Sequence, residues 1–194
     1  MRANNQRGYS LPEGAVVIAI AMLLAALGVP TLRAYSVEAQ LLGAGREFKG
    51  RFLKARSTAV RLSVETAIRF EPQTDGVHYS IYIDGNFNGV LSAEIESGID
   101  KRIEGPFLLT SGAPDVRVGI NPGVPAIPPD TGELDPSDPI RFGPSDILSF
   151  SPLGTATPGT FYIATRWTQG AVRVSPGSAR VALLTCRNRM WSER

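Results

Sequence analysis

The chain of 194 residues almost lacks the side chains that build disulfides and metal centres. It has one cysteine, Cys186, and one histidine, His78. A single cysteine excludes an intrachain disulfide framework and a cysteine-based zinc site, and a single histidine excludes a histidine-cluster metal site. The two residues could form only one nucleophile and base pair, and no recognisable motif surrounds either of them. We therefore expect no enzyme activity and no cofactor.

Net charge is also nearly absent, with 20 basic and 18 acidic side chains. The charges are nevertheless segregated along the chain. Residues 33–61 carry seven basic and two acidic side chains, residues 62–165 carry five and fourteen, and residues 166–194 carry six and one. Blocks of opposite sign can attract one another within a subunit or between subunits.

One long uncharged run lies near the start of the chain. Residues 14–32 are nineteen consecutive uncharged residues, close to the ~20 that cross a bilayer as a helix. One carboxylate, Glu13, precedes this run, and a short leader ends at Gly8. A conventional secretory signal is cleaved after its apolar stretch. Here the polar leader that ends at Gly8 precedes the apolar run. Cleavage after Gly8 would therefore keep the apolar run on the mature chain.

This segment resembles the class III signal of type IV pilins and type II secretion pseudopilins. The matching residues are Val16-Val17-Ile18-Ala19-Ile20, Ala25-Ala26 and Val29-Pro30, while Tyr9 and Pro12 depart from the usual phenylalanine and apolar residue. The resemblance implies that a prepilin peptidase cuts after Gly8 and methylates Tyr9. It also implies that Glu13 pairs with a free N-terminal amine during assembly. The simpler alternative is a glutamate at the lipid headgroup boundary.

An amphipathic helix is expected to continue over residues 34–61. Apolar residues recur there at steps of three and four: Leu41, Ala44, Phe48, Phe52, Ala55 and Ala59. Basic side chains take mainly the other positions. The apolar stripe therefore needs another part of the chain to cover it.

From residue 62 onward the hydrophobic period drops to two, which predicts strands. Strands are expected over 62–70 and 78–83, and near 105–110, 116–120, 147–151, 160–165, 171–175 and 179–185. Seven of the fifteen prolines lie between Pro122 and Pro144, which predicts an exposed loop over 121–145. A helix followed by many short strands predicts an α+β fold.

The second half of the chain is similar to the GspH/FimT pseudopilin domain. The similar stretches are Ile147–Ala156, Gly159–Ile163, Ala171–Pro176 and, at the helix-to-strand transition, Ala55–Arg61. The resemblance implies a pilin-like fold, in which a long N-terminal helix with a transmembrane first half packs on antiparallel β-sheets. It divides the chain into a leader (1–8), a transmembrane or filament-core helix (9–33), an amphipathic continuation (34–61) and a β-rich domain (62–194).

The same resemblance implies a minor pseudopilin of a type II secretion system, assembled into a periplasmic pseudopilus for protein secretion. The alternative is a FimT-like minor pilin of a type IV pilus that takes part in DNA uptake. Partners would be other pseudopilins or minor pilins, the prepilin peptidase and the inner-membrane assembly platform. We expect a single-pass protein of the bacterial inner membrane, with its globular domain in the periplasm before it enters the fibre.

A polar segment around residue 85 has two interpretations. Asp84, Asn86 and Asn88 place oxygens at alternate positions, as in the first half of a calcium loop. The twelfth position, where a bidentate acid would close such a site, is Ile95. A polar hairpin turn explains the same residues more simply.

Two arginines near the C-terminus, Arg187 and Arg189, belong to a sparse basic stripe that could bind the phosphates of DNA. A solvated strand face, or a contact with the acidic middle of the chain, is more economical. We therefore do not expect a nucleic acid to be the main partner.

Overall fold

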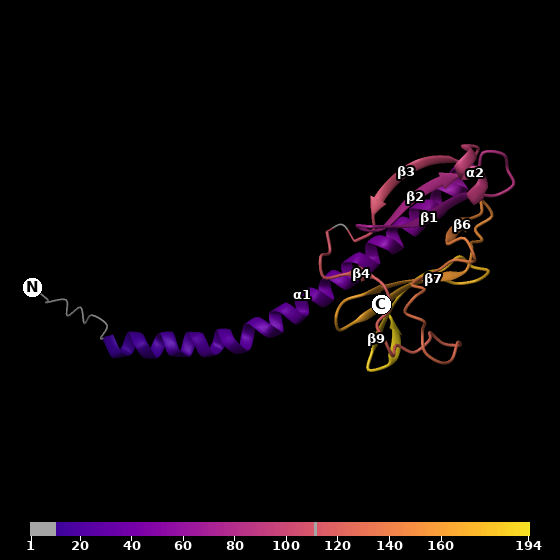
Figure 1. The fold of residues 1–194 in the computed structure, drawn as a ribbon. Coiled ribbons are helices and arrows are strands. Elements are labelled where there is room, and N and C mark those ends of the chain that lie inside the picture. Colours follow the sequence, from indigo (N-terminus) through magenta and orange to yellow (C-terminus); the bar gives the residue numbers. More distant parts are fainter. Residues whose placement is uncertain (1–10, 111) are drawn as a thin grey trace, which may run out of the picture. The chain divides into compact units, whose positions relative to one another are not determined.

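A computed structural model describes residues 11–110 and 112–194, with the side chains of residues 27–31 and 34 left outside the description. The chain divides into two compact units, Met1–Val37 and Glu38–Arg194. One long helix, α1 (Leu11–Leu62), contributes to both units, and all strands belong to the second (Figure 1).

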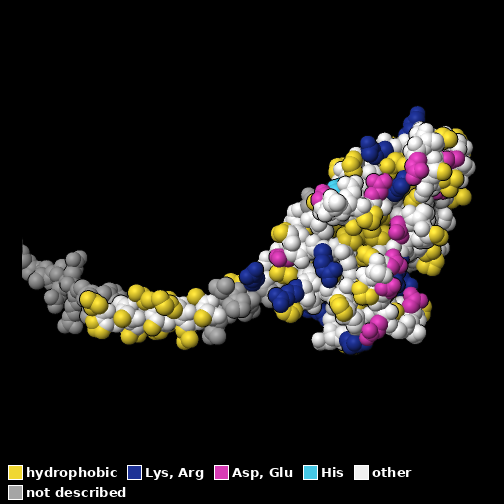
Figure 2. Space-filling view, viewed as in Figure 1, with side chains coloured by type: hydrophobic (Ala, Val, Ile, Leu, Met, Phe, Trp, Pro, Cys, Tyr) yellow, Lys and Arg dark blue, Asp and Glu magenta, His cyan; other side chains and the backbone are white. Residues whose placement is uncertain are grey.

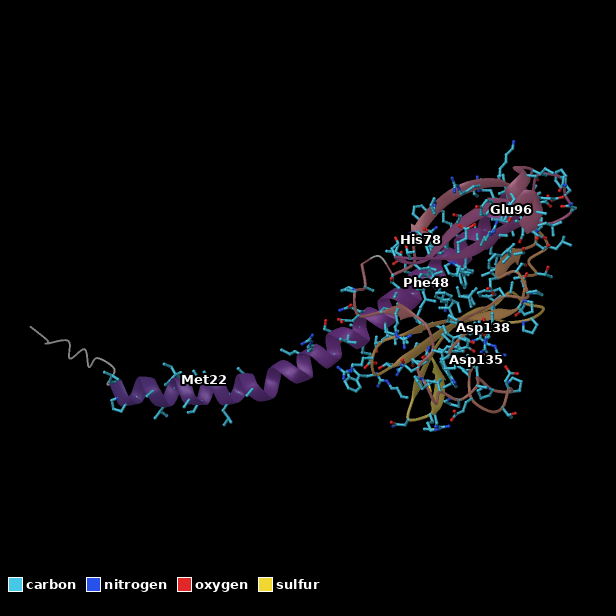
Figure 3. The ribbon with its side chains drawn as sticks, viewed as in Figure 1. Met22, Phe48, His78, Glu96, Asp135 and Asp138 are labelled. Atoms are coloured by element: carbon cyan, nitrogen blue, oxygen red, sulfur yellow. The ribbon has the colours of Figure 1, made fainter. Side chains whose placement is uncertain are left out.

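The described part of the first unit is an apolar helix. Its large side chains are more than half exposed: Val16, Val17, Ile18, Ile20, Met22, Leu23 and Leu24, at 53–67%. Apolar surface covers this segment in the space-filling view, and side chains such as Met22 point away from the helix axis (Figures 2 and 3). These residues occupy successive helical positions, so no polar face is left for water.

The expected transmembrane first half is the part of the fold prediction that is wrong. Helix α1 has 52 residues, but its apolar segment with described side chains, 11–26, covers only 16. Within the described part of the chain, no helix combines the length and the apolar character required to cross a membrane.

In the second unit, α1 is amphipathic as predicted. The six apolar residues of the expected stripe are all buried, at most 7% exposed: Leu41, Ala44, Phe48, Phe52, Ala55 and Ala59. Phe48 lies on the part of α1 that faces the strands, and its ring meets Phe161 edge-on at 5.0 Å between centroids (Figure 3). The helix ends at Leu62 because Ser63 adopts a left-handed conformation (φ 55°), a common helix stop. The strand predicted from residue 62 therefore begins later, at Thr66.

The first sheet has four strands in the order β3-β2-β1-β6, all antiparallel. Its strands are β1 (Thr66–Gln73), β2 (Gly76–Ile83), β3 (Lys101–Leu108) and β6 (Ile147–Phe150). A short helix, α2 (Ser92–Ser97), lies between β2 and β3 in the sequence.

The second sheet has the order β10-β9-β8-β7-β4, with β5 also pairing with β7, and is likewise antiparallel. Its strands are β4 (Arg117–Val118), β5 (Ile140–Arg141), β7 (Gly159–Ala164), β8 (Gln169–Val174), β9 (Val181–Arg187) and β10 (Met190–Glu193). Both sheets and α1 contribute to one apolar core. The predicted α+β architecture with antiparallel sheets is confirmed.

The proline-rich segment is for the most part the exposed loop that its prolines suggested, but some of its apolar residues are buried. Val124, Ile127 and Leu134 are at most 9% exposed and pack against Tyr162 and Ala171, on the face of the second sheet opposite the main core. Prolines cannot pair in a ladder, but the apolar residues between them can still cover a sheet face. The segment therefore closes a second, smaller core.

Candidate functional site

The first turn of α1 holds one acidic residue, Glu13. Pro12 precedes it, in a turn where the missing N–H of proline has no intrahelical partner to lose. A carboxylate at this end of a helix is stabilised by the helix dipole. Glu13 borders a shallow, almost wholly apolar depression together with Pro12, Val16 and Val17. Among the described residues that line this depression, Glu13 carries the one charge and the others are apolar.

The expected processing residues, Gly8 and Tyr9, lie outside the described residues. Cleavage after Gly8 and methylation of Tyr9 therefore stay predictions from the sequence.

The polar segment after β2 is organised around Asp84, which is 7% exposed. Its Oδ1 accepts hydrogen bonds from the backbone N–H groups of Asn86 (2.9 Å) and Phe87 (2.7 Å), and its Oδ2 accepts one from Gly89 (2.8 Å). Burial raises the pKa of the Asp84 carboxyl, but the backbone N–H donors outweigh it and hold the pKa below its usual value. The charged form of Asp84 therefore shapes this loop.

The two asparagines of the proposed calcium loop also hold the loop together. The side-chain amides of Asn86 and Asn88 both donate to Oε1 of Glu94, at 3.0 and 2.8 Å. Among the described residues, no group of three or more His, Cys, Asp or Glu side chains is arranged to hold a metal ion. The loop is not a tight hairpin turn, because α2 lies between it and β3, the strand that pairs with β2.

A second buried carboxylate, Asp100, was missed from the sequence. It is 2% exposed, and its oxygens accept the N–H groups of Gly85 (3.1 Å) and Leu91 (2.9 Å). Two buried carboxylates, Asp84 and Asp100, thus fix both ends of one loop. Only the acidic character of the segment could have indicated this, since sixteen positions separate the two residues.

The two arginines proposed for DNA binding each contact a carboxylate. Arg187 pairs with Glu38 at the start of the second unit, and Arg189 pairs with Glu133 in the proline-rich segment at 3.0 Å. Such exposed pairs contribute little stability, but they lower the positive charge available to phosphates. The alternative of a contact with acidic parts of the same chain fits this geometry.

Cys186 and His78 lie in different sheets, on β9 and β2, so they do not form a nucleophile and base pair. His78 instead contacts Asp75, with Nε2 and Oδ2 3.5 Å apart.

Burial raises the pKa of the Cys186 thiol, and the opposing effect of Arg189 is smaller. Because only the thiolate reacts, we expect iodoacetamide to alkylate Cys186 in the folded chain several-fold more slowly than in the denatured chain at pH 7.5. The rate should rise between pH 8 and pH 10. Equal rates for the folded and denatured chains, followed by mass spectrometry, would contradict this assignment.

No protein-family model, curated protein or solved structure matches the chain.

Proposed function

We propose that the chain is a minor pseudopilin of a type II secretion system, a subunit that joins other pseudopilins in a periplasmic fibre assembled at the bacterial inner membrane. The observation that supports this proposal most is the first unit, in which a helix exposes apolar side chains on every side and carries one carboxylate in its first turn. A minor pilin of a type IV pilus would use the same assembly surface and is the alternative.

An apolar helix without a polar face needs a covering in its working state. Burying such a surface against neighbouring copies is favourable by about 25 cal/mol per Å² of apolar area. In a fibre core, the helices of adjacent subunits provide that covering. The second unit carries its own closed core and can remain outside the fibre core.

Glu13 supplies the specificity that apolar contacts lack. A carboxylate buried among apolar helices is costly unless a cation pairs with it. The N-terminal amine of a processed neighbour would be such a cation, and only one axial position of the two helices brings the charges together. This pairing would set the register of the subunits.

Intact-mass measurement of the protein from its native host tests the processing step. We expect the chain to begin at Tyr9 and to carry one added methyl group. A chain that keeps residues 1–8 would overturn the proposal.

Replacement of Glu13 by glutamine tests the assembly step. Glu13→Gln should be processed normally, but its amount in the sheared fibre fraction should fall at least several-fold, because the glutamine cannot pair with an amine. The matched control is Glu47→Gln, which removes an exposed carboxylate of α1 in the second unit and should assemble like the parent. Equal incorporation of both variants would contradict the role of Glu13.

A further inference from the structure

Two exposed apolar side chains flank an acidic depression at the end of the second unit where α1 stops. The depression, about 270 Å³ in volume, is lined by Ser63, Val64, Glu65, Asp84, Phe87, Asn88, Gly89 and Pro152. Phe87 is 79% exposed, and Leu153, the neighbour of Pro152, is 92% exposed. We call the lining residues and Leu153 the socket.

The exposure of Phe87 is built into the loop. Phe87 has φ 66°, a left-handed conformation that is strained for a bulky side chain. The hydrogen bond from its N–H to Asp84 holds it there, and the ring points into solvent. Leu153 is held similarly, because its N–H donates to the Ser151 hydroxyl (3.1 Å) in a tight turn. Both side chains are therefore presented on stiff loops.

The charge of the socket is negative. Its lining includes two carboxylates, Glu65 and Asp84, and no lysine, arginine or histidine; Arg56 approaches the neighbouring Gly154 but does not line the depression. Asp84 is engaged by backbone donors. Within the described residues, the Glu65 carboxylate accepts one hydrogen bond, from the N–H of Val90 to Oε1 (3.3 Å), so Oε2 can accept from a cation. A ligand of this site should combine a cation with an apolar group.

The second unit carries such a group at its other end. In the turn between β7 and β8, the guanidinium of Arg166 lies over the ring of Trp167, 4.6 Å from its centre. Trp167 is 75% exposed, and the turn is held by Thr165, whose hydroxyl accepts the N–H groups of Trp167 and Thr168. We call Arg166 and Trp167 the knob.

The knob and the socket of one copy cannot meet. The start of β8 lies beside Leu41, since a methyl group built on Gly170 would be 3.5 Å from the Leu41 side chain. The socket begins at Ser63, just past the end of α1. The intervening helical turns span ~33 Å at 1.5 Å per residue. Any contact between these surfaces therefore joins two molecules.

We propose that the knob of one copy binds the socket of the next, so that the second units associate head to tail. Trp167 would pack between Phe87 and Leu153, and the guanidinium of Arg166 would pair with Glu65. Such a contact uses different patches on the two partners and can repeat without closing. The proposal gives the fibre subunit a second contact surface, one that does not involve the apolar helix.

Disulfide trapping in the full-length chain tests this contact. Two copies are prepared in the Cys186→Ser background, one with Pro152→Cys at the edge of the socket, where Pro152 lines it, and one with Thr168→Cys beside the knob. Mixed and mildly oxidised, they should give a covalent heterodimer. Adding Trp167→Ala to the knob copy, or Phe87→Gly to the socket copy, should lower the yield at least tenfold.

Two controls keep the result interpretable. Glycine adopts φ 66° without strain, so Phe87→Gly should unfold at or above the temperature of the parent. Met190→Ala removes another exposed apolar side chain, 71% exposed, and should leave the yield unchanged. Copies that associate without forming the 152–168 disulfide, or a yield that Trp167→Ala does not change, would overturn the head-to-tail contact. Neither result bears on processing after Gly8, so the two proposals can fail separately.

Discussion

Replacing Phe52 with alanine should lower the free energy of unfolding by about 3–5 kcal/mol. Phe52 is 1% exposed, and its ring meets Phe70 and Phe142 edge-on at 6.3 and 5.9 Å. These partners come from the first sheet and from the residue after β5, so the cavity would open where α1 and the strands share the core. Denaturant unfolding followed by circular dichroism measures the loss.

The neighbouring residue provides the matched control for this substitution. Leu53 is on the same helix and is 43% exposed, so Leu53→Ala should cost less than about 1 kcal/mol. Losses of similar size for the two variants would show that α1 does not occupy the core in the way described above.

Replacing Asp84 with alanine should have the second largest effect, a loss of about 3 kcal/mol. The substitution leaves the N–H groups of Asn86, Phe87 and Gly89 without their acceptor, and an unsatisfied buried donor costs about 1–3 kcal/mol. Water can reach part of this loop, which keeps the total below the sum of three full penalties. Thermal unfolding of the parent and the variant measures the difference.

The lowered pKa of Asp84 gives this prediction a pH dependence. A carboxylate with a lowered folded-state pKa contributes its full stability above the unfolded value, about 3.9, and loses it as pH falls through the folded-state pKa. The difference between parent and Asp84→Ala should therefore be constant near pH 7 and shrink below about pH 4.

Asp135 provides a matched control for Asp84. It is exposed, and one of its oxygens accepts the N–H of Ser137 at 2.9 Å. Asp135→Ala should cost less than Asp84→Ala at pH 7. A difference between parent and Asp84→Ala that persists unchanged to pH 2 would show that the carboxylate charge does not hold the loop.

The stripe of α1 in the second unit could be predicted because helical burial is a local property of the sequence. Each residue from Leu41 to Ala59 in the stripe is buried as its spacing indicates. The expected membrane span rested on a count of uncharged residues, 14–32, whereas the described apolar side chains at the start of α1 end at residue 26.

The packing of the proline-rich segment could not be predicted from its prolines, because proline excludes ladder pairing but does not indicate where the apolar residues between the prolines pack. The strands beneath it show why a cover is needed. Five of the six residues are buried in β7, and five of the six are buried in β8. A strand buried on both faces needs a second covering layer. Val124, Ile127 and Leu134 provide it, and their spacing alone has no helical or strand period that would have indicated this.

The sequence indicated that the segment around Asp84 is a polar loop. It could not indicate which distant residues accept hydrogen bonds from that loop. Asp100 and Glu65 reach it from sixteen and nineteen positions away. Contacts of that separation depend on how strands are paired, and sequence periodicity does not report pairing. The socket was missed for the same reason, since Pro152 and Phe87 line one depression only in the folded chain.

The shared core has a mechanical consequence for a subunit that is pulled along α1. The buried stripe of this helix packs against side chains from both sheets. Closely packed interiors transmit strain instead of absorbing it. Tension on the helix would load many contacts in shear at once, so the second unit should resist extraction of α1 far better than it would resist peeling of a single edge strand.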